Sequence, residues 1–430
     1  MFQKRYLVYF GIFLLMAFNY VDRVSLSVAA PSLSKDFGLS SVELGYLFSA
    51  FLAPYIVCMI PWGFLMDRYG ARRMNAIGVA LWSISTVLTG FVWSYATALT
   101  MRLLMGAAEA SSLSAGTRAL REWAPRKEYG LATSMMSTGT YFGPAIGLLL
   151  ISWVVSMSSW RMGFIVAGLL GFAWLAAQLI WFRNPEQATF LDEEERQFIL
   201  RERDAERPAQ GDAGFGGLLR SRSLWAVAVA HGCAAYTQLL FLTWLPSYLA
   251  TERHLSIMST GLFTTLPYVI AAFGTWGLGL LSDRLLRGVD TNAGKRRWMV
   301  CVAMLGASVV LLAPLVDSVF MILVLITISL TSMATAMSLN MALSSDLLQS
   351  PADAGKTIGF YLTISNVGGL SAPIATGYII AYTGSYNWAF TAGGILLIIA
   401  AIITMTLTYS PIGVLRGART VLEPSMPSRT

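Results

Sequence analysis

Charged residues are scarce in this sequence of 430 residues. Asp, Glu, Lys and Arg together make up 12%, about half of the fraction that soluble domains carry. Apolar residues account for 56% and gather in long stretches, such as 76–93 and 163–181, close to the roughly 20 residues that cross a bilayer as a helix. So few charges could not keep such stretches in water, and the sequence therefore predicts a membrane protein.

Cysteine and histidine are almost absent as well. The three cysteines, Cys58, Cys233 and Cys301, stand alone within apolar stretches, and the two histidines, His231 and His254, have no metal-ligand spacing. We therefore expect the cysteines to be small packing residues. We also expect no metal site, no cofactor and no catalytic cluster, so that the protein is not an enzyme.

Twelve apolar stretches are predicted to cross the membrane as helices. They are 6–30, 42–66, 74–94, 96–118, 129–153, 161–182, 223–250, 257–282, 297–315, 318–343, 356–382 and 386–409. The first one follows Lys4 and Arg5, as in a signal peptide, but it contains Asp22 and Arg23 and runs directly into further spans. We therefore interpret it as an uncleaved helix.

Basic residues predict the orientation, because they mark the cytoplasmic side of membrane helices. All but five of the 30 Lys and Arg residues fall in the even-numbered loops and at the two termini; the exceptions are Arg23, Lys35, Arg102, Arg161 and Arg253. Both termini are thus predicted to be cytoplasmic, in a multi-pass protein of the inner membrane. The net charge of +7 reflects this bias and does not call for nucleic acid. A monomer is expected.

A polar stretch divides the chain into two halves of six spans. Residues 184–222 are rich in charge and then in glycine, which is typical of a solvated cytoplasmic linker. We predict an N-terminal half at 1–183, a C-terminal half at 223–410 and a cytoplasmic tail at 411–430. The halves repeat landmarks in the same order, among them Gly143-Pro144 and Ala372-Pro373, which indicates a duplicated unit of the kind found in rocking carriers.

The loop after the second span carries a motif whose chemistry can be stated directly. Gly63 and Gly70 allow close approach and a tight turn, Asp67 can accept hydrogen bonds from a neighbouring arginine or helix end, and Arg68 is one of several basic residues there. The motif resembles the signature loop of the major facilitator superfamily. In the second half, Asp283 and Arg284 occupy the equivalent positions. The expected gating residues are therefore Gly63, Asp67, Arg68, Gly70, Asp283 and Arg284.

This resemblance implies a fold class and a mechanism. The fold would be an all-α membrane protein, with twelve transmembrane helices in two six-helix pseudo-repeats. Transport would proceed by alternating access, as the two halves rock about a central site.

Two further stretches resemble the anion:cation symporter branch of that superfamily. The first span contains Asn19-Tyr20-Val-Asp22-Arg23, and the fourth contains Arg102 and Glu109. Members of this branch carry sugar acids, aromatic carboxylates and related organic anions, usually with protons. The resemblance implies import of a small organic anion by proton symport.

Charges inside membrane spans are costly and are functional candidates for that reason. Arg102 and Glu109 are seven residues apart and share one helix face. Arg23 is the predicted anchor for the carboxylate or sulfonate, because a guanidinium can bind it through two hydrogen bonds. Glu109 is the predicted proton carrier, Asp22 a second titrating group, and Arg102 the partner that tunes Glu109. The alternative is an ion-pair network that only holds the two spans together.

The resemblance implies several uncharged site residues. Tyr20, Tyr55 and Asn366 match positions where the branch places polar cavity residues, although they could equally be satisfied groups at helix interfaces. Thr140 stands where carriers of polyhydroxylated acids often have Gln. Its shorter side chain favours a smaller or less hydroxylated anion.

One motif supports a different function. Gly139, Gly143, Pro144 and Gly147 resemble the span-five motif of proton-coupled drug exporters, except that Leu148 replaces the last glycine. Glycines at this spacing also simply let two helices pack closely. Proton-coupled export of drugs or metabolites is therefore kept as the alternative to import.

Overall fold

The computed structural model describes residues 3–125, 128–203, 214–286, 294–349 and 353–413. This part of the chain is helical apart from turns, loops and one isolated bridge between Leu348 and Ile412. The helices of the first half are α1 (Arg5–Phe37), α2 (Ser41–Ser49), α3 (Leu52–Tyr69), α4 (Ala71–Thr89), α5 (Tyr95–Trp123), α6 (Tyr129–Met157) and α7 (Trp160–Trp181). Those of the second half are α10 (Arg222–Thr251), α11 (Ile257–Leu286), α12 (Lys295–Ala307), η3 (Ser308–Leu315), α13 (Val319–Asp346), α14 (Ala354–Thr383) and α15 (Asn387–Leu407).

The linker between the halves contains short helices, η1 (Pro185–Gln187), α8 (Glu193–Arg203) and α9 (Gly214–Leu219). Residues 204–213 of the linker lie outside the described residues. So does most of the predicted tail, from residue 414 onward.

Every predicted span corresponds to a helix or to a pair of consecutive helices. The second span is made of α2 and α3, and the ninth is made of α12 and η3. Ten of the twelve segments are long and apolar enough to cross a membrane. The other two are α4, which starts with several polar residues, and α5, which contains Arg102 and Glu109. Both have the length of a span, and they pack against each other inside the first half.

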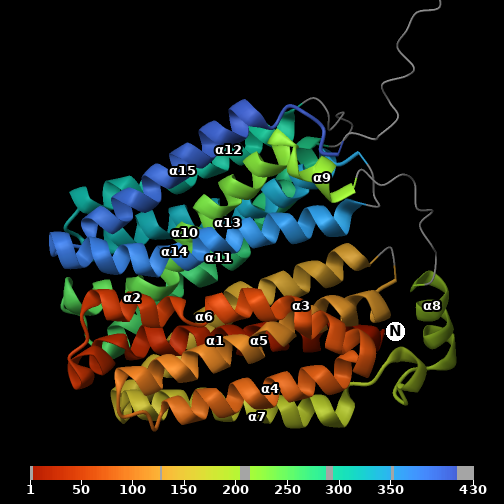
Figure 1. Ribbon diagram of the computed structural model, residues 1–430, viewed down its shortest axis with the longest axis horizontal. Coiled ribbons are helices and arrows are strands. Elements are labelled where there is room, and N and C mark those ends of the chain that lie inside the picture. The colour runs from red at the N-terminus through yellow and green to blue at the C-terminus, as the bar shows by residue number, and fades with distance from the viewer. Residues whose placement is uncertain (1–2, 126–127, 204–213, 287–293, 350–352, 414–430) are drawn as a thin grey trace, which may run out of the picture.

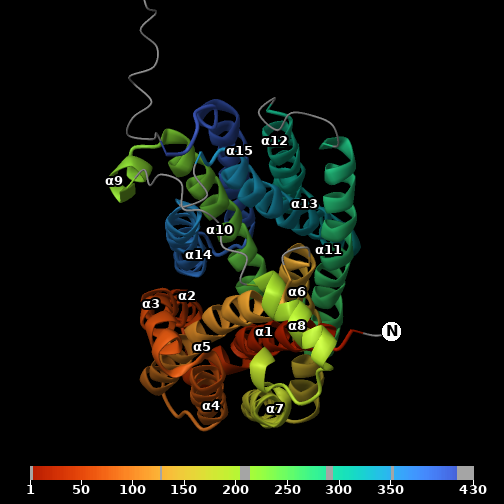
Figure 2. The same ribbon diagram turned by 90° about the vertical axis from the view of Figure 1, so that its right-hand side faces the viewer.

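The two halves form two separate layers of helices (Figure 1), with α1–α7 in one layer and α10–α15 in the other. The turned view shows the same division, and α8 lies beside the end of the first half where the chain begins (Figure 2). We call this end of the molecule the linker end. The outer surface exposes many large apolar side chains, such as Val57, Phe64 and Leu315, each more than two-thirds exposed, as expected where helices face lipid.

The halves meet on the side of the molecule away from the linker end. The hydroxyl of Ser27 on α1 donates to the carbonyl oxygen of Leu242 on α10, at 2.7 Å. The hydroxyl of Thr265 on α11 donates to the carbonyl oxygen of Ala145 on α6, at 3.0 Å. All four residues lie beyond the middle of their helices as seen from the linker end.

Glycines bring the backbones of the halves into contact at the same side. A Cβ atom added to Gly45 on α2 would lie 2.5 Å from the carbonyl oxygen of Pro373 on α14, and one added to Gly377 would lie 2.4 Å from the carbonyl oxygen of Ser41. A side chain at either glycine would therefore force α2 and α14 apart. The molecule is closed at this end.

At the linker end a large cavity separates the halves. Its volume is about 1380 Å³, and its lining includes Gly63 and Asp67 from the first half and Ala354 and Ile358 from the second. Ser114 on α5 also lines it. The protein is therefore open at the linker end and closed at the opposite one.

The linker helix α8 is fixed to the first half by a partly buried ion network. Arg5 contacts Glu128, which precedes α6, at 2.5 Å and Glu195 on α8 at 3.0 Å, and its side chain is only 5% exposed. The carboxylate of Glu195 also accepts hydrogen bonds from the backbone N–H groups of Lys4 and Arg5. It thus pairs donors at the start of α1 that no helical carbonyl can reach. The hydrogen bonds from Arg5 hold the pKa of Glu128 below its ordinary value.

Replacing Arg5 by Ala is expected to destabilise the protein by about 3 kcal/mol, because it leaves two partly buried carboxylates without their cation. Since the folded pKa of Glu128 is depressed, its stabilising contribution is present above the unfolded value and is lost as the pH falls through the folded value. The melting temperature of the purified wild type should therefore drop on acidification from pH 5 towards 3, and that of Arg5→Ala should be lower at neutral pH and change less. Lys4→Ala is the control, because its pair with Asp192 is exposed and contributes little.

Candidate functional site

The predicted site residues gather at one depth, halfway along their helices. Arg23, Tyr55, Glu109, Thr140 and Asn366 each lie within three residues of the middle of a membrane-crossing segment. Carriers built from two such repeats bind their substrates near the middle of the membrane, at the interface between the repeats. The sequence alone placed these residues in spans, and the structure adds that they share a level.

Arg23 and Glu109 form an ion pair at this level. The Nε atom of Arg23 lies 2.6 Å from Oε1 of Glu109, and the two side chains are 10% and 1% exposed. The other carboxylate oxygen of Glu109 is buried and accepts no hydrogen bond from the described residues. A pair that is broken here leaves an uncompensated charge away from water, so the two side chains depend on each other.

Aromatic rings surround the guanidinium of Arg23. Its central carbon lies 4.6 Å from the centre of the Tyr20 ring, 5.0 Å from Phe51 and 4.9 Å from Tyr55. Cations are attracted to the faces of aromatic rings at such distances. Tyr20 and Tyr55, predicted as cavity residues, therefore hold Arg23 in place. Phe51 was not predicted, because nothing in a single sequence distinguishes it from a packing phenylalanine.

Asp22 takes no part in this ion pair and is buried beside α4. It is 2% exposed, and neither carboxylate oxygen has a hydrogen-bond partner among the described residues. Trp82 and Thr86 of α4 are its polar neighbours. The angle of about 100° between adjacent helical residues separates Asp22 from Arg23 in this way.

Arg102 lies deep in the first half rather than on the cavity wall. It is 2% exposed, its guanidinium lies 5.1 Å from the centre of the Phe51 ring, and it contacts the sulfur of Met105 at 3.2 Å. The ion pair of Glu109 is with Arg23 and not with Arg102. Glu109 therefore forms its ion pair with Arg23, and the role predicted for Arg102, to tune Glu109, stays a prediction.

Thr140 and Asn366 lie on the two helices that flank the site. The hydroxyl of Thr140 donates to the carbonyl oxygen of Ser137, at 2.7 Å, in its own helix. Asn366 is half-buried on α14, one helical turn from Leu370, which packs against the cluster that contains Tyr55. The role predicted for Asn366, a polar group of the substrate cavity, stays a prediction.

The signature loop forms its contacts within the first half. Asp67 pairs with Arg118 of α5 at 2.5 Å, and Gly70 has a φ of +87° at the turn into α4, a conformation that favours glycine. Gly63 and Asp67 line the cavity at the linker end, whereas Arg68 is exposed. The role of Arg118 could not be predicted, since 51 residues separate it from Asp67.

In the second half, Arg284 is exposed near the end of α11. The side chain of Asp283, its neighbour in the predicted gating set, lies outside the described residues. The structure therefore shows the side-chain contacts of the gating residues for the loop after α3, but not for Asp283 in the loop after α11.

The glycine motif of α6 packs this helix against α1. Cβ atoms added to Gly139 and Gly143 would lie 2.4 and 2.5 Å from carbonyl oxygens of α1, and one added to Gly147 would lie 2.7 Å from the side chain of Val24. Leu148, where the exporter motif has glycine, is buried. Helix packing accounts for the spacing of the motif.

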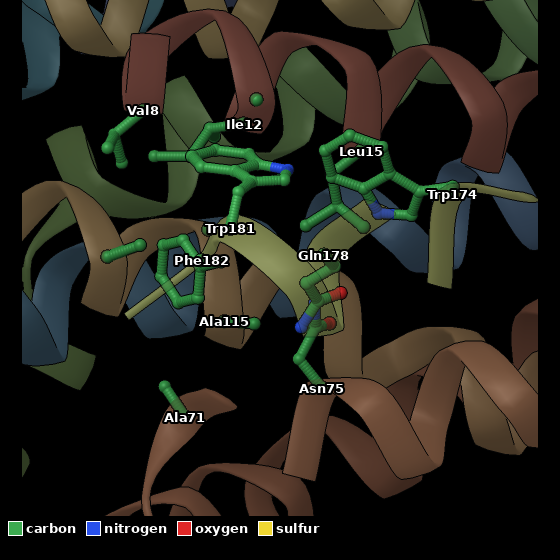
Figure 3. Close-up of a pocket in the computed structure, with 13 residues that line it drawn as sticks. Val8, Ile12, Leu15, Ala71, Asn75, Ala115, Trp174, Gln178, Trp181 and Phe182 are labelled. Carbon is green, nitrogen blue, oxygen red and sulfur yellow. The ribbon is translucent and has the colours of Figure 1, made fainter. Parts of the chain in front are cut away.

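A small second cavity lies inside the first half, between α1, α4, α5 and α7 (Figure 3). Its volume is about 20 Å³, enough for about one water molecule. Asn75 and Gln178 face each other there, and Nδ2 of Asn75 donates to Oε1 of Gln178 at 2.9 Å. This cavity is too small for an organic solute, whereas the cavity between the halves, at about 1380 Å³, is large enough for one. No group of three or more His, Cys, Asp or Glu residues suited to a metal occurs among the described residues.

Two helical halves, a cavity between them that is open at one end, and an ion pair buried at mid-depth within the first half define a multi-pass membrane carrier. The pattern of the Major Facilitator Superfamily matches residues 12–294 and 289–427. The chain belongs to this family. It is a transporter and not an enzyme, as the sequence predicted.

Relatives and solved structures agree with this assignment. The chain is 30% identical over 398 residues to "Probable sulfoacetate transporter SauU" of Cupriavidus necator, covering 92% of each chain. It is also 30% identical over 427 residues to "Probable galactarate/D-glucarate transporter GudP" of Bacillus subtilis, covering 95% of this chain and 92% of the relative.

The fold is similar to that of an inward-facing, occupied bacterial homologue of the human lysosomal transporter Spinster, with a TM-score of 0.76, 18% identity and coverage of 95% and 98%. The Escherichia coli xylose transporter XylE gives a TM-score of 0.73 with 14% identity and coverage of 94% and 96%. The predicted fold of twelve helices in two six-helix repeats is confirmed.

Proposed function

We propose that this protein imports a small organic anion together with protons, and that Arg23 and Glu109 couple the two. The ion pair between these residues, buried at mid-depth, is the observation that carries the proposal. Relatives named as carriers of sulfoacetate, galactarate and D-glucarate support an acidic solute. The anion would be a carboxylate, a sugar acid, an aromatic acid or a sulfonate.

The coupling follows from competition for one guanidinium. Binding a carboxylate or sulfonate through two parallel hydrogen bonds requires the donors of Arg23, and Glu109 already occupies its Nε. A proton on Glu109 neutralises that side chain and frees Arg23 for the solute. Proton and anion then favour each other's binding by the same factor, as linkage requires. Asp22, buried and without a hydrogen-bond partner among the described residues, is the second candidate for a proton.

The protein is proposed to lie in the inner membrane, with its open end facing the cytoplasm. The charge bias of the loops supports a cytoplasmic location for the two termini and the linker. The present state would then release solute inward, and rocking would open the far end. The protein is proposed to act as a monomer.

Uptake into proteoliposomes tests the function directly. Purified protein, reconstituted with an inward proton gradient, is expected to accumulate a radiolabelled organic acid above its external concentration. A panel of sugar acids, aromatic acids and sulfonates covers the proposed classes. Collapsing the gradient with a protonophore should remove accumulation, and the absence of gradient-driven uptake for every acid would overturn the proposal. Protection of cells from lipophilic toxicants, without acid uptake, would establish export instead.

A further inference from the structure

A pocket of about 470 Å³ lies between α10 and α15 at the linker end of the second half. α10 begins there at Arg222, directly after the linker, and α15 ends there at Leu407. In both views α15 lies on the side of the second half that is turned away from the first (Figures 1 and 2). The pocket shares no lining residue with the cavity between the halves, so it is separate from the proposed path of the solute.

Two arginines form the polar end of this pocket. Arg220 and Arg222 line it and are both exposed, and no Asp or Glu is among the lining residues. Neither arginine forms an ion pair with any residue that the structure describes. Both guanidinium groups are therefore available to an anion, and a guanidinium matches the geometry of a phosphate group through two parallel hydrogen bonds.

Trp225 lies next to the arginines and marks the depth of the pocket in the membrane. Its indole N–H donates to the carbonyl oxygen of Leu219 at 2.9 Å, and its ring packs edge-on against Phe360 of α14, with 4.9 Å between the ring centres. Tryptophan is enriched where the headgroups of a bilayer meet its hydrocarbon core. The two arginines, which precede Trp225 at the start of α10, are thus at the level of the lipid headgroups.

The rest of the pocket is apolar and leads into the membrane. Val229 on α10 is seven residues beyond Arg222, which corresponds to about 10 Å along the helix. The side chains that line this deeper part are Ala226, Val229, Ile403 and Leu407. A cationic mouth that continues into an apolar channel suits a ligand with an anionic head and a hydrocarbon chain.

A hydrogen-bonded serine joins the two walls of the pocket. The hydroxyl of Ser223 on α10 donates to the carbonyl oxygen of Leu407 on α15, at 3.2 Å, and accepts a hydrogen bond from the backbone N–H of Ser410, also at 3.2 Å. The ends of α10 and α15 are therefore held beside each other, and the pocket is formed before a ligand enters it.

The first half has a similar groove without the cations. It lies between α1 and α7, which are the first and last membrane-crossing helices of that half, and has a volume of about 570 Å³. No charged residue is among its lining residues. The groove thus recurs with the internal repeat, whereas the arginines occur only at the pocket of the second half and are not required for its shape.

We infer that the pocket between α10 and α15 binds an anionic phospholipid, with the phosphate group on Arg220 and Arg222 and an acyl chain between the two helices. Basic pockets between membrane helices are a known means of recognising anionic headgroups. The tail that follows α15, residues 411–430, carries three arginines and one glutamate, so its charge does not match this pocket. The bound lipid connects the first and last helices of the second half and stabilises this half.

Native mass spectrometry of the purified full-length protein tests the inference. Phosphatidylglycerol is compared with phosphatidylcholine that has the same acyl chains. The anionic lipid is expected to bind about thirtyfold more tightly, because each arginine contributes a factor of about five. In the double variant Arg220→Gln/Arg222→Gln this preference should disappear, while binding of phosphatidylcholine stays unchanged.

A matched control removes the same charge elsewhere. Arg73 and Arg201 are also exposed and belong to the first half and to α8, so Arg73→Gln/Arg201→Gln should keep the full preference for phosphatidylglycerol. Because both double variants change exposed side chains only, we expect them to fold. The melting temperature provides an independent measurement: phosphatidylglycerol should raise that of the wild type more than phosphatidylcholine does, and this difference should vanish in Arg220→Gln/Arg222→Gln.

Three results would overturn the inference. These are equal binding of the two lipids by the wild type, an undiminished preference in Arg220→Gln/Arg222→Gln, and displacement of phosphatidylglycerol by inorganic phosphate, which would indicate a site for free anions. The pocket contains none of the residues assigned to transport, so these outcomes are independent of the proposed function.

Discussion

Replacing Glu109 by Gln should abolish accumulation driven by the proton gradient while exchange of labelled for unlabelled anion continues. Gln has the shape of protonated Glu and no charge, so Arg23 loses its competitor and stays available to the solute. The Gln side chain cannot bind or release a proton at this position, so the proton gradient can no longer drive uptake of the anion. We expect accumulation to fall about 5- to 150-fold, to the level of facilitated exchange, as the coupling free energy disappears.

The measurement compares two assays on the same proteoliposomes. Uphill uptake under an inward proton gradient should be lost, and counterflow without a gradient should persist. Asp36→Asn is the control, because this carboxylate also pairs with an arginine, Arg161, at 3.2 Å, but lies near the end of α1 at the closed side of the molecule. Intact accumulation in Glu109→Gln would assign the proton to another group, with Asp22 the first to test.

Replacing Arg23 by Ala should weaken anion binding by a large factor. The substitution deletes the only cation that the described structure places against Tyr20 and Tyr55 at the central level, and it leaves Glu109 buried without a partner. Losing one partner of a buried ion pair or an anchoring guanidinium costs about 3–5 kcal/mol, which corresponds to a loss of roughly a hundredfold to several thousandfold in affinity.

A conservative variant and a control make this result interpretable. Arg23→Lys keeps the charge but not the two parallel hydrogen bonds, so binding should be weakened less than in Arg23→Ala. Arg161→Ala is the control, because Arg161 also pairs with a carboxylate, that of Asp36, and lies over the ring of Trp160, but far from the site. Calorimetric affinities unchanged in Arg23→Ala would rule out the proposed anchor.

The overall architecture could be predicted because membrane segments are encoded locally. A run of about 20 apolar residues identifies itself whatever surrounds it, and the twelve predicted runs recur as helices. The helix ends are less predictable: α1 continues to Phe37, well beyond the predicted end at residue 30, because polar residues after the bilayer core can continue a helix until a glycine such as Gly38, with a φ of +64°, ends it.

The site could be predicted only in part, because its pairings join distant parts of the chain. Charge at mid-span singled out Arg23 and Glu109 as candidates, yet 86 residues separate them. Helix periodicity reveals which residues share one helix face, so it suggested Arg102 as the partner of Glu109. It carries no information about which face of α1 meets which face of α5. Phe51, whose ring lies against Arg23, gave no signal at all, since a phenylalanine in an apolar helix resembles any other packing residue.

The closed end of the molecule has a consequence for how readily it reopens. Its two halves are joined there by hydroxyl-to-carbonyl hydrogen bonds and by glycines against backbone, and no ion pair among the described residues links one half to the other. Separating the two halves at this end therefore leaves no unpaired charge inside the membrane. Neither the inward-open nor the outward-open state then needs to be strongly preferred. A solute that binds one of these states only modestly better than the other can shift the equilibrium between them.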